Sequence, residues 1–264
     1  MEHKNQISVT NLRYGYEKGQ EIIHGVTASF APGKMTALLG ANGCGKSTFL
    51  NLIAGVLKPN AGEILVNDKK IRLLNRKALA KMIAVVHQSN AAPGDMTVEK
   101  LVTAGRTPYR ERFHGLSKED ERAVREALED TDTLELASRP VLSLSGGQMQ
   151  RVWLAMALAQ ETDILLLDEI TTYLDIHYQL ELLHLIAELN RKKGLTVIMV
   201  LHDLNLALEY CQEAVVMKKG QILAAGAVEQ AITETVLEEA FDVAASIVEA
   251  GDRRHCIFRR KAEH

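Results

Sequence analysis

Residues 40–48 carry the residue types that bind phosphate groups. They read Gly-Ala-Asn-Gly-Cys-Gly-Lys-Ser-Thr, which fits the pattern G-x-x-x-x-G-K-[ST]. Glycines let backbone N–H groups turn toward an anion, and the helix expected after Lys46 points its positive end at the same place. Lys46 can reach the β- and γ-phosphates, and the Ser47 hydroxyl suits Mg²⁺. The spacing predicts a loop that binds a nucleoside triphosphate, with Cys44 as a tolerated small residue.

A pair of carboxylates follows an apolar run farther along the chain. Residues 164–167 are all isoleucine or leucine, and Asp168 and Glu169 come directly after them. A buried strand of this kind ends at the carboxyl edge of a parallel sheet, where ligands bind. Asp168 is predicted to hold Mg²⁺ through its water shell, and Glu169 to polarise the water that attacks the γ-phosphate. Coupled to the phosphate loop, these acids predict hydrolysis.

A second helix start with exposed backbone donors is predicted at residues 144–151. The segment reads Leu-Ser-Gly-Gly-Gln-Met-Gln-Arg, and its serine and glycines can begin a helix whose positive end accepts a phosphate. The full string resembles the signature motif of ATP-binding cassette (ABC) ATPases. The order and spacing of the motifs match that family along essentially the whole chain. The resemblance implies ATP and Mg²⁺ as cofactors.

The resemblance to ABC ATPases implies roles for further residues. It implies that Tyr16 stacks on adenine, that Gln88 touches Mg²⁺ and the attacking water, and that His202 hydrogen-bonds the γ-phosphate. It also implies that the loop at Leu174-Asp175 contacts a partner subunit. The implied catalytic residues are Glu169, His202 and Gln88, and the implied metal ligands are Ser47, Gln88 and Asp168. The implied nucleotide contacts are Tyr16, Gly40, Asn42, Gly43, Gly45, Lys46, Ser47, Thr48, Ser145, Gly146, Gly147 and Gln148.

One residue departs from the pattern of the family. ABC ATPases usually carry proline directly after the catalytic glutamate, whereas this chain has Ile170. Proline would fix φ and remove a backbone donor, while isoleucine keeps the extended preference and restores the N–H group. We expect the loop to form and hydrolysis to persist.

Alternating strand and helix patterns must position these motifs. Such alternation implies a parallel sheet covered on both faces. The expected fold class is an α/β P-loop NTPase core of the ABC type, with a mixed sheet, an antiparallel β part at the N-terminus and an inserted α-helical subdomain. An amphipathic helix is predicted to end at Gly194. Strands are predicted at 7–9, 22–30, 35–39, 63–66, 83–86, 164–167 and 195–201, a late hairpin at 215–223, and a helix from Met149 to about Ala159.

The character of the chain changes between about Thr97 and Gln160. Charged, alanine-rich helical sequence dominates there, and β-branched runs disappear. Because no flexible linker marks its edges, this part is expected to be a second lobe rather than a tethered domain. We predict a single ABC ATPase domain over 1–264, with a core lobe at 1–88 and 161–264 and a helical subdomain at about 89–160.

Composition and charge limit the classes of function. The 264 residues include 31 Lys and Arg against 34 Asp and Glu, a net charge of -3 that argues against nucleic acid as a partner. The basic tail at 253–261 is interpreted as the solvated end of a last strand. No apolar run reaches the roughly 20 residues of a membrane span, and no secretory signal is visible. Three scattered cysteines fit a reducing cytosol.

Two local strings indicate a subgroup of the family. Residues 171–179 (Thr-Thr-Tyr-Leu-Asp-Ile-His-Tyr-Gln) and 104–109 (Ala-Gly-Arg-Thr-Pro-Tyr) resemble the ATPases of ferric siderophore, haem and cobalamin importers. The second string lies where permease coupling helices dock in such importers, with a polar loop between helices as the alternative. It is expected to present an exposed mix of arginine and aromatic residues suited to an interface, namely Arg106, Pro108, Tyr109 and Arg110.

The expected function is ATP hydrolysis that powers import of a ferric siderophore. One phosphate loop and one signature motif resemble half of an ABC pair, which implies a homodimer. The implied partners are two integral-membrane permease chains and, indirectly, a substrate-binding protein, with this chain on the cytoplasmic face of a bacterial membrane. The alternatives are a transporter ATPase for cobalamin, haem or an exported cargo, and a non-transport ABC ATPase with a soluble partner. No second cassette, long coiled coil or sizeable carboxy-terminal domain is expected.

Overall fold

The computed structural model describes residues 6–16, 19–88, 96–110, 115–172, 174–251 and 253–260. The chain divides into two units, one formed by Met1–Leu73 with Thr196–His264 and the other by Leu74–Leu195. We call them the sheet unit and the helical unit. Within the described ranges, no helix is both long enough and apolar enough to cross a membrane.

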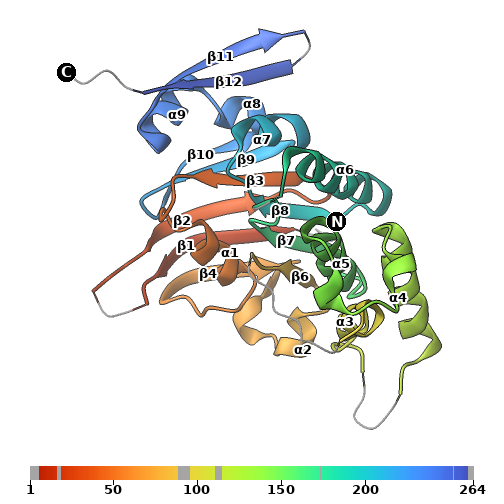
Figure 1. Cartoon of the computed structure of the whole chain (residues 1–264). Helices are drawn as coiled ribbons and strands as arrows, with labels where there is room; N and C mark the ends of the chain where they lie inside the picture. The colour runs from red at the N-terminus through yellow and green to blue at the C-terminus, as the bar shows by residue number, and fades with distance from the viewer. Residues whose placement is uncertain are drawn as a thin grey trace. The chain divides into compact units, whose positions relative to one another are not determined.

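The sheet unit holds most of the strands (Figure 1). One antiparallel sheet has the order β2-β1-β4-β5, and in the other β10, β9, β3 and β8 lie side by side. β3 is parallel to both of its neighbours, whereas β9–β10 and β11–β12 are antiparallel pairs. The elements are β1 (Ile7–Tyr14), β2 (Ile23–Phe30), β3 (Met35–Gly40), α1 (Lys46–Ile53), β4 (Ala61–Val66), β5 (Lys69–Lys70), a 3₁₀ turn (Ile71–Leu73), β8 (Thr196–Val200), α7 (Leu204–Tyr210), β9 (Glu213–Lys218), β10 (Gln221–Ala227), α8 (Val228–Ala231), α9 (Glu234–Phe241), β11 (Ala244–Ala250) and β12 (Arg253–Arg259).

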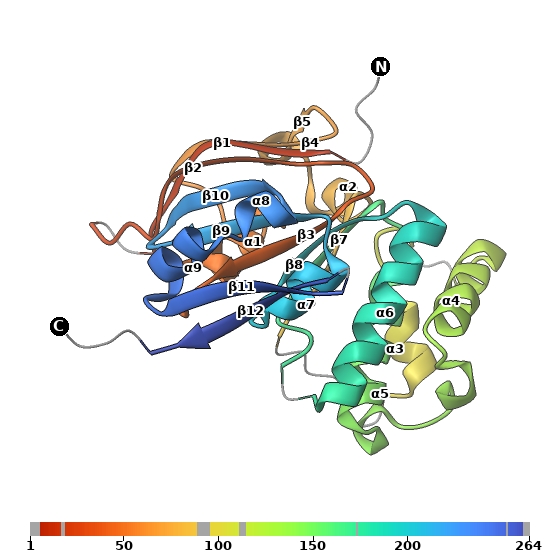
Figure 2. The ribbon, with the colours of Figure 1, turned by 90° about the horizontal axis from the view of Figure 1, so that it is seen from above.

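The helical unit contains one parallel strand pair and a group of helices. β6 pairs with β7, and α5 packs against both α3 and α4, which Figure 2 shows from above. Its elements are α2 (Arg76–Leu79), β6 (Ile83–Val86), α3 (Val98–Ala104), α4 (Lys118–Asp130), two 3₁₀ turns (Leu134–Leu136 and Val141–Ser143), α5 (Gly146–Leu158), β7 (Ile164–Asp168) and α6 (Ile176–Lys193).

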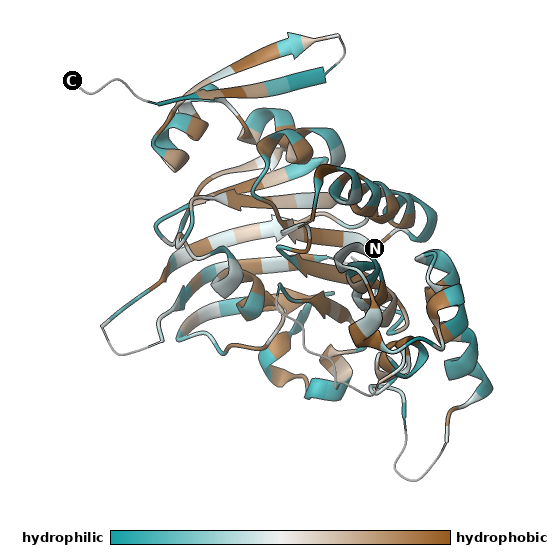
Figure 3. Ribbon diagram, viewed as in Figure 1, coloured by the Kyte–Doolittle hydropathy of each residue, from teal (hydrophilic) through white to brown (hydrophobic). Residues whose placement is uncertain are grey.

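Burial follows the hydropathy of the sequence in both units. Every residue of β3, β7 and β8 is buried, as expected for parallel strands covered on both faces. These strands are brown in Figure 3, whereas α4 is largely teal. α4 buries only one stripe, which includes Ala123, Val124, Ala127 and Leu128, so it covers the unit from the solvent side.

Most predicted elements are confirmed, with differences at three places. β1 extends to Tyr14 instead of ending at residue 9. A shift in the register with β2 near Asn11, whose φ is 47°, allows pairing to continue beyond the polar residues of the strand. α5 starts at Gly146 rather than Met149, because Ser145 caps it there. The predicted hairpin is β9–β10, but α8, α9 and β11 were not predicted. The basic tail is confirmed as strand β12 up to Arg259, while Lys261 lies outside the described residues.

Asp130 joins the end of α4 to the end of α6. Its carboxylate forms ion pairs with Lys192 at 2.6 Å and with Lys193 at 2.7 Å, and its side chain is only 10% exposed. Burial alone would raise the pKa of Asp130, but the two ammonium groups hold that pKa below its ordinary value. A lowered pKa in the folded state stabilises the fold at pH values above the unfolded pKa of about 4. This stabilisation is lost as the pH falls through the folded-state pKa.

We therefore predict that Asp130→Asn lowers the free energy of unfolding at pH 7 by about 1 kcal/mol. At about pH 2 the difference from the wild type should shrink, because Asp130 becomes protonated, and so neutral like asparagine, as the pH falls through its lowered folded-state pKa. Urea titrations at the two pH values measure it. The matched control is Asp132→Asn, since Asp132 is 92% exposed and 3.7 Å from its partner Arg151. An equal loss at both pH values would contradict the prediction.

Candidate functional site

The phosphate loop joins β3 to α1 in the sheet unit, as the pattern predicts. Gly40 has φ 144° and Gly45 has φ 107°, values that favour glycine. A Cβ on Gly40 would lie 2.3 Å from the carbonyl oxygen of Met217 and 2.7 Å from Cys44 Sγ. Asn42 and Gly43 are exposed at the tip of the loop. The loop therefore follows a path that requires glycine and presents the start of α1 to an anion.

Two side chains inside this loop are buried. Lys46 is 5% exposed, and its Nζ donates to the carbonyl oxygens of Gly40 at 2.8 Å and Ala41 at 3.2 Å. These bonds hold the ammonium at the inner edge of the loop. Burial raises the pKa of the Cys44 thiol, which keeps it protonated and slow to react near neutral pH. The interpretation of Cys44 as a small packing residue fits this environment.

Tyr16 lies beside the phosphate loop although it comes from the other sheet of the unit. Its ring is 61% exposed and meets the Tyr14 ring edge-on at 5.1 Å. Its hydroxyl lies 3.5 Å from Thr48 Oγ1, and Ser47 and Thr48 are the second and third residues of α1. An exposed aromatic face next to the loop suits stacking on a nucleotide base.

Strand register brings His202 to the same sheet edge as the phosphate loop. β3 and β8 are parallel neighbours, and Leu38 pairs with Val200. Gly40 and His202 each follow two residues later, so both lie at the carboxyl edge. His202 is exposed. Asp203, which follows it, caps α7 by accepting from the N–H of Asn205 at 2.8 Å.

The helical unit repeats this arrangement with Gln88 and Glu169. β6 and β7 are parallel, and Val86 pairs with Leu167. Two residues later, Gln88 Nε2 donates to Glu169 Oε2 at 2.6 Å. A glutamine and a carboxylate that come from separate motifs, 81 positions apart, are therefore in direct contact. Asp168, which directly precedes Glu169 in the sequence, is the last residue of β7 and is buried.

The backbone turns sharply at Glu169. Its φ is 52°, a left-handed conformation that costs a non-glycine residue energy and is concentrated at functional sites. Thr172 N–H donates to the Glu169 carbonyl at 3.1 Å and closes the turn. Ile170 is 3% exposed, so the residue that replaces the usual proline is accommodated inside the unit. Persistence of hydrolysis with this isoleucine stays a prediction.

The start of α5 has the geometry of a capping box. Gln148 N–H donates to Ser145 Oγ at 3.4 Å, and Ser145 N–H donates to Gln148 Oε1 at 3.1 Å. Ser145 and Gly146 are exposed. The helix is 13 residues long, so its dipole and first N–H groups form an anion-accepting end, as the sequence predicts.

Tyr178 is a neighbour of this helix start that the sequence did not single out. A Cβ on Gly147 would lie 2.9 Å from Tyr178 Cδ1, whereas one on Gly146 would meet only Leu174 Cδ2 at 3.7 Å. Tyr178 belongs to α6 and follows the loop at Leu174-Asp175, whereas Tyr173 lies outside the described residues. The two motifs are thus packed together, and no local sequence signal reveals it.

The contrast between the two glycines gives a prediction. Gly147→Ala should lower the free energy of unfolding by about 1 kcal/mol, because the new methyl group displaces the Tyr178 ring. Gly146→Ala, the matched control, should change it by less than about 0.5 kcal/mol. Thermal unfolding measures both. Adding Tyr178→Ala to Gly147→Ala should remove the clash, and equal effects of the two single substitutions would contradict this explanation.

The string at residues 104–109 is placed differently from the prediction. Arg106 is 1% exposed and Pro108 is also buried, Tyr109 is half-buried, and Ala104, Thr107 and the following Arg110 are exposed. The expectation of an exposed mix of arginine and aromatic residues is therefore wrong for Arg106 and Pro108. Acidic side chains far along the sequence surround the Arg106 guanidinium, and no local pattern could predict them.

Comparison with known proteins identifies the family. The profile of the ABC transporter family matches residues 23–172. The iron(3+)-hydroxamate import ATP-binding protein FhuC of Bacillus subtilis is 43% identical over 244 residues, which are 92% of this chain and 90% of that protein. The chain belongs to the ABC transporter family. It is an ATP-binding, ATP-hydrolysing cassette.

Solved structures support the same fold for this ABC ATPase. An ABC transporter in an inward-facing conformation contains a chain that is 28% identical, with a TM-score of 0.83 and coverage of 97% of this chain and 98% of that one. A dimeric bacterial ABC transporter cassette is also 28% identical, with a TM-score of 0.74 and coverage of 84% and 98%. The predicted α/β P-loop NTPase fold of the ABC type is confirmed.

Proposed function

We propose that this ABC ATPase powers import of an iron chelate of the ferric siderophore class through separate permease chains. The likeness to the Bacillus subtilis iron(3+)-hydroxamate import protein carries the proposal. Its 244 matched residues extend well beyond residues 23–172, the part common to ABC transporters at large. Sequence similarity outside the part common to ABC transporters is expected between ATPases that serve the same type of permease and cargo.

The proposed catalytic step is attack of water on the γ-phosphate of ATP, which breaks the bond from the γ-phosphorus to the bridging oxygen and releases ADP and phosphate. Lys46 and the glycine-rich backbone bind the phosphates, and Tyr16 stacks on the base. Glu169 accepts a proton from the water, while Gln88 and His202 orient the water and the γ-phosphate. The 2.6 Å bond from Gln88 to Glu169 supports their joint action.

The donor set fits Mg²⁺. The proposed ligands are the Ser47 hydroxyl, the Gln88 amide and the Asp168 carboxylate, whose hard oxygens suit this ion. Mg²⁺ would neutralise charge that develops on the phosphates. Ser47 opens α1, and Gln88 and Asp168 lie at the ends of neighbouring parallel strands.

We further propose that two copies work as a homodimer. In this arrangement Ser145, Gly146, Gly147 and Gln148 of one copy contact the ATP held by the phosphate loop of the other. Exposure of Ser145 and Gly146 supports it, because both residues are open to contact with a nucleotide held by another copy.

The proposed partners are two permease chains at the cytoplasmic face of a bacterial membrane, served indirectly by a substrate-binding protein. The core lobe at 1–88 and 161–264 would bind ATP, and the lobe at about 89–160 would transmit closure to the permease.

A paired experiment tests the proposal. Cells that lack this chain are given labelled ferric hydroxamate, haem or cobalamin, and are complemented with the wild type or with Glu169→Gln. Tagged protein is purified from a detergent extract in parallel. The proposal predicts uptake of the iron chelate only with the wild type, and co-purification of a membrane permease. Recovery of only soluble proteins or nucleic acid would overturn it, and rescue of cobalamin or haem uptake alone would reassign the cargo.

A further inference from the structure

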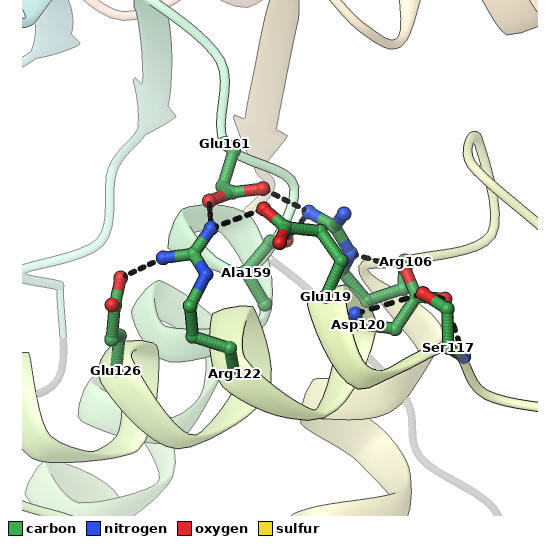
Figure 4. Close-up of polar contacts among 8 residues, drawn as sticks. All are labelled: Arg106, Ser117, Glu119, Asp120, Arg122, Glu126, Ala159 and Glu161. Atoms are coloured by element: carbon green, nitrogen blue, oxygen red, sulfur yellow. Dashed lines mark hydrogen bonds and ion pairs between the residues drawn. The ribbon is translucent and has the colours of Figure 1, made fainter.

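Arg106 is a buried cation with several polar and charged partners in the helical unit. Its Nε donates to Asp120 Oδ1 at 2.8 Å, and one terminal nitrogen donates to the carbonyl of Ala159 at 2.8 Å and to Glu161 Oε2 at 2.7 Å. The guanidinium also lies 4.0 Å from the centre of the Tyr109 ring. Figure 4 shows the polar contacts converging on Arg106.

Arg106 and these partners lie at the ends of three helices. Arg106 follows the C-cap of α3, Asp120 is the N3 residue of the α4 capping box, and Ala159 is the C-cap of α5. α3 and α5 also meet closely, since a Cβ on Gly105 would lie 2.2 Å from the Met156 carbonyl oxygen. Arg106 therefore joins all three helices at one point.

A second arginine extends the cluster toward solvent. Arg122 on α4 pairs with Glu161 Oε1 and Glu126 Oε2, both at 2.7 Å, and with Glu119. Glu161 thus bridges Arg106 and Arg122. Its φ is 49°, so the chain adopts a left-handed turn directly after α5 where this carboxylate meets both arginines.

The electrostatics favour the ionised form of Asp120. Burial alone would raise the pKa of Asp120, but hydrogen bonds from Arg106 and Ser117 hold that pKa below its ordinary value. Buried ion pairs of this kind contribute little net stability compared with well-packed apolar residues. Their rigid geometry is what an apolar cluster would not supply, because the planar arginine fork fixes the direction of each partner.

We propose that Arg106 is a positioning residue for the signature helix. Arg106 binds the C-terminal end of α5 to α3 and α4. Ser145 caps the other end of α5, which is 13 residues or about 20 Å long. Rigid attachment at Ala159 and Glu161 then sets the direction in which Ser145–Gln148 face a nucleotide. The functional part rests on the proposed role of those residues in the ATPase cycle.

The test compares three variants of the full-length chain. Arg106→Lys keeps the charge but lacks the fork. Arg106→Met with Asp120→Leu replaces the buried pair by apolar groups and leaves Glu161 paired with Arg122. Arg125→Ala is the control, because Arg125 is 71% exposed and, among the residues that the structure describes, pairs only with Glu129, one turn along α4, at 2.9 Å. For each variant the unfolding temperature, ATP affinity, kcat and KM, and hydrogen exchange of residues 146–149 are measured.

The expected result separates position from stability. Arg106→Lys should lower kcat at least about tenfold, with ATP affinity within about twofold, because misplaced groups cost turnover more than ground-state binding. Exchange at 146–149 should rise about fivefold. The Arg106→Met/Asp120→Leu variant should unfold near the wild-type temperature yet show the same loss of kcat as Arg106→Lys. Arg125→Ala should leave the unfolding temperature, kcat and hydrogen exchange at their wild-type values.

Two outcomes would overturn the positioning role. One is a folded Arg106→Lys or Met/Leu variant with wild-type exchange at 146–149. The other is a kcat that recovers together with the unfolding temperature, which would make the cluster purely stabilising. A wild-type chain that hydrolyses no ATP would instead contradict the proposed function, and the exchange measurement would still decide the positioning role.

Discussion

Glu169→Gln is expected to lower steady-state ATP turnover by about 10²–10⁴-fold while ATP affinity stays within about twofold. Glutamine keeps the size of the side chain and can still bond to Gln88, which lies 2.6 Å from Glu169 Oε2. It cannot accept a proton from water near neutral pH. The chemical step should therefore fail, while binding, which depends on the phosphate loop, should persist.

Steady-state phosphate release and equilibrium ATP binding measure these two effects separately. The matched control is Glu188→Gln on α6, because Glu188 is 55% exposed and pairs with His184 and Arg191 at the surface. The control should turn over ATP at the wild-type rate. If Glu169→Gln also did so, the base would have to be another residue. An equal loss of binding and turnover would point to collapse of the strained turn at Glu169.

Lys46→Ala should weaken ATP binding by about 10–100-fold, since a hydrogen bond to a charged group contributes about 1.5–3 kcal/mol. Lys46 is the buried cation of the loop, 5% exposed, and its Nζ is held within 2.8 Å of the Gly40 carbonyl oxygen. Because these contacts already hold the Lys46 side chain in place, little side-chain entropy is lost when a phosphate binds. Removal of the ammonium should therefore reduce affinity directly.

Equilibrium binding of ATP and of adenosine distinguishes the causes. Adenosine lacks phosphates, so its weak binding should not change if Lys46 acts only on the phosphate groups. The control is Lys58→Ala, because Lys58 is exposed in the same unit. The unfolding temperature should also be measured, since Lys46 bonds to two carbonyls of its own loop. Unchanged affinity for ATP would contradict the proposed role of Lys46.

Local patterns were sufficient for the motifs and for most elements of the fold. The glycines at 40, 43 and 45 predict a phosphate-binding loop, and each of them has a positive φ. Buried apolar runs predict β3, β7 and β8, and Gly194 ends α6 with φ 66°. These features depend on interactions within a few residues, such as steric freedom of glycine and period-dependent burial.

Other features were beyond a local interpretation of the sequence. The helices α8 and α9 and the strand β11 were not predicted. A weakly apolar segment such as β11 forms a strand only when β12 pairs with it. Tyr178 was quoted only as part of a string, although it packs on Gly147 from 31 positions away. Arg106 was predicted to be exposed as part of an interface, because no local pattern indicates the acidic residues that surround it in the fold.

By itself, the sequence determined the chemistry of this ABC ATPase, because a phosphate loop and a signature helix are short segments whose residue types act on a ligand directly. The tertiary structure decided which distant residues support that chemistry. Strand register in each unit aligned pairs of proposed site residues, namely Gly40 with His202 and Gln88 with Glu169. Folding also buried Arg106 among carboxylates from 14 and 55 positions away. A buried charge requires such partners, and only the folded chain brings them together.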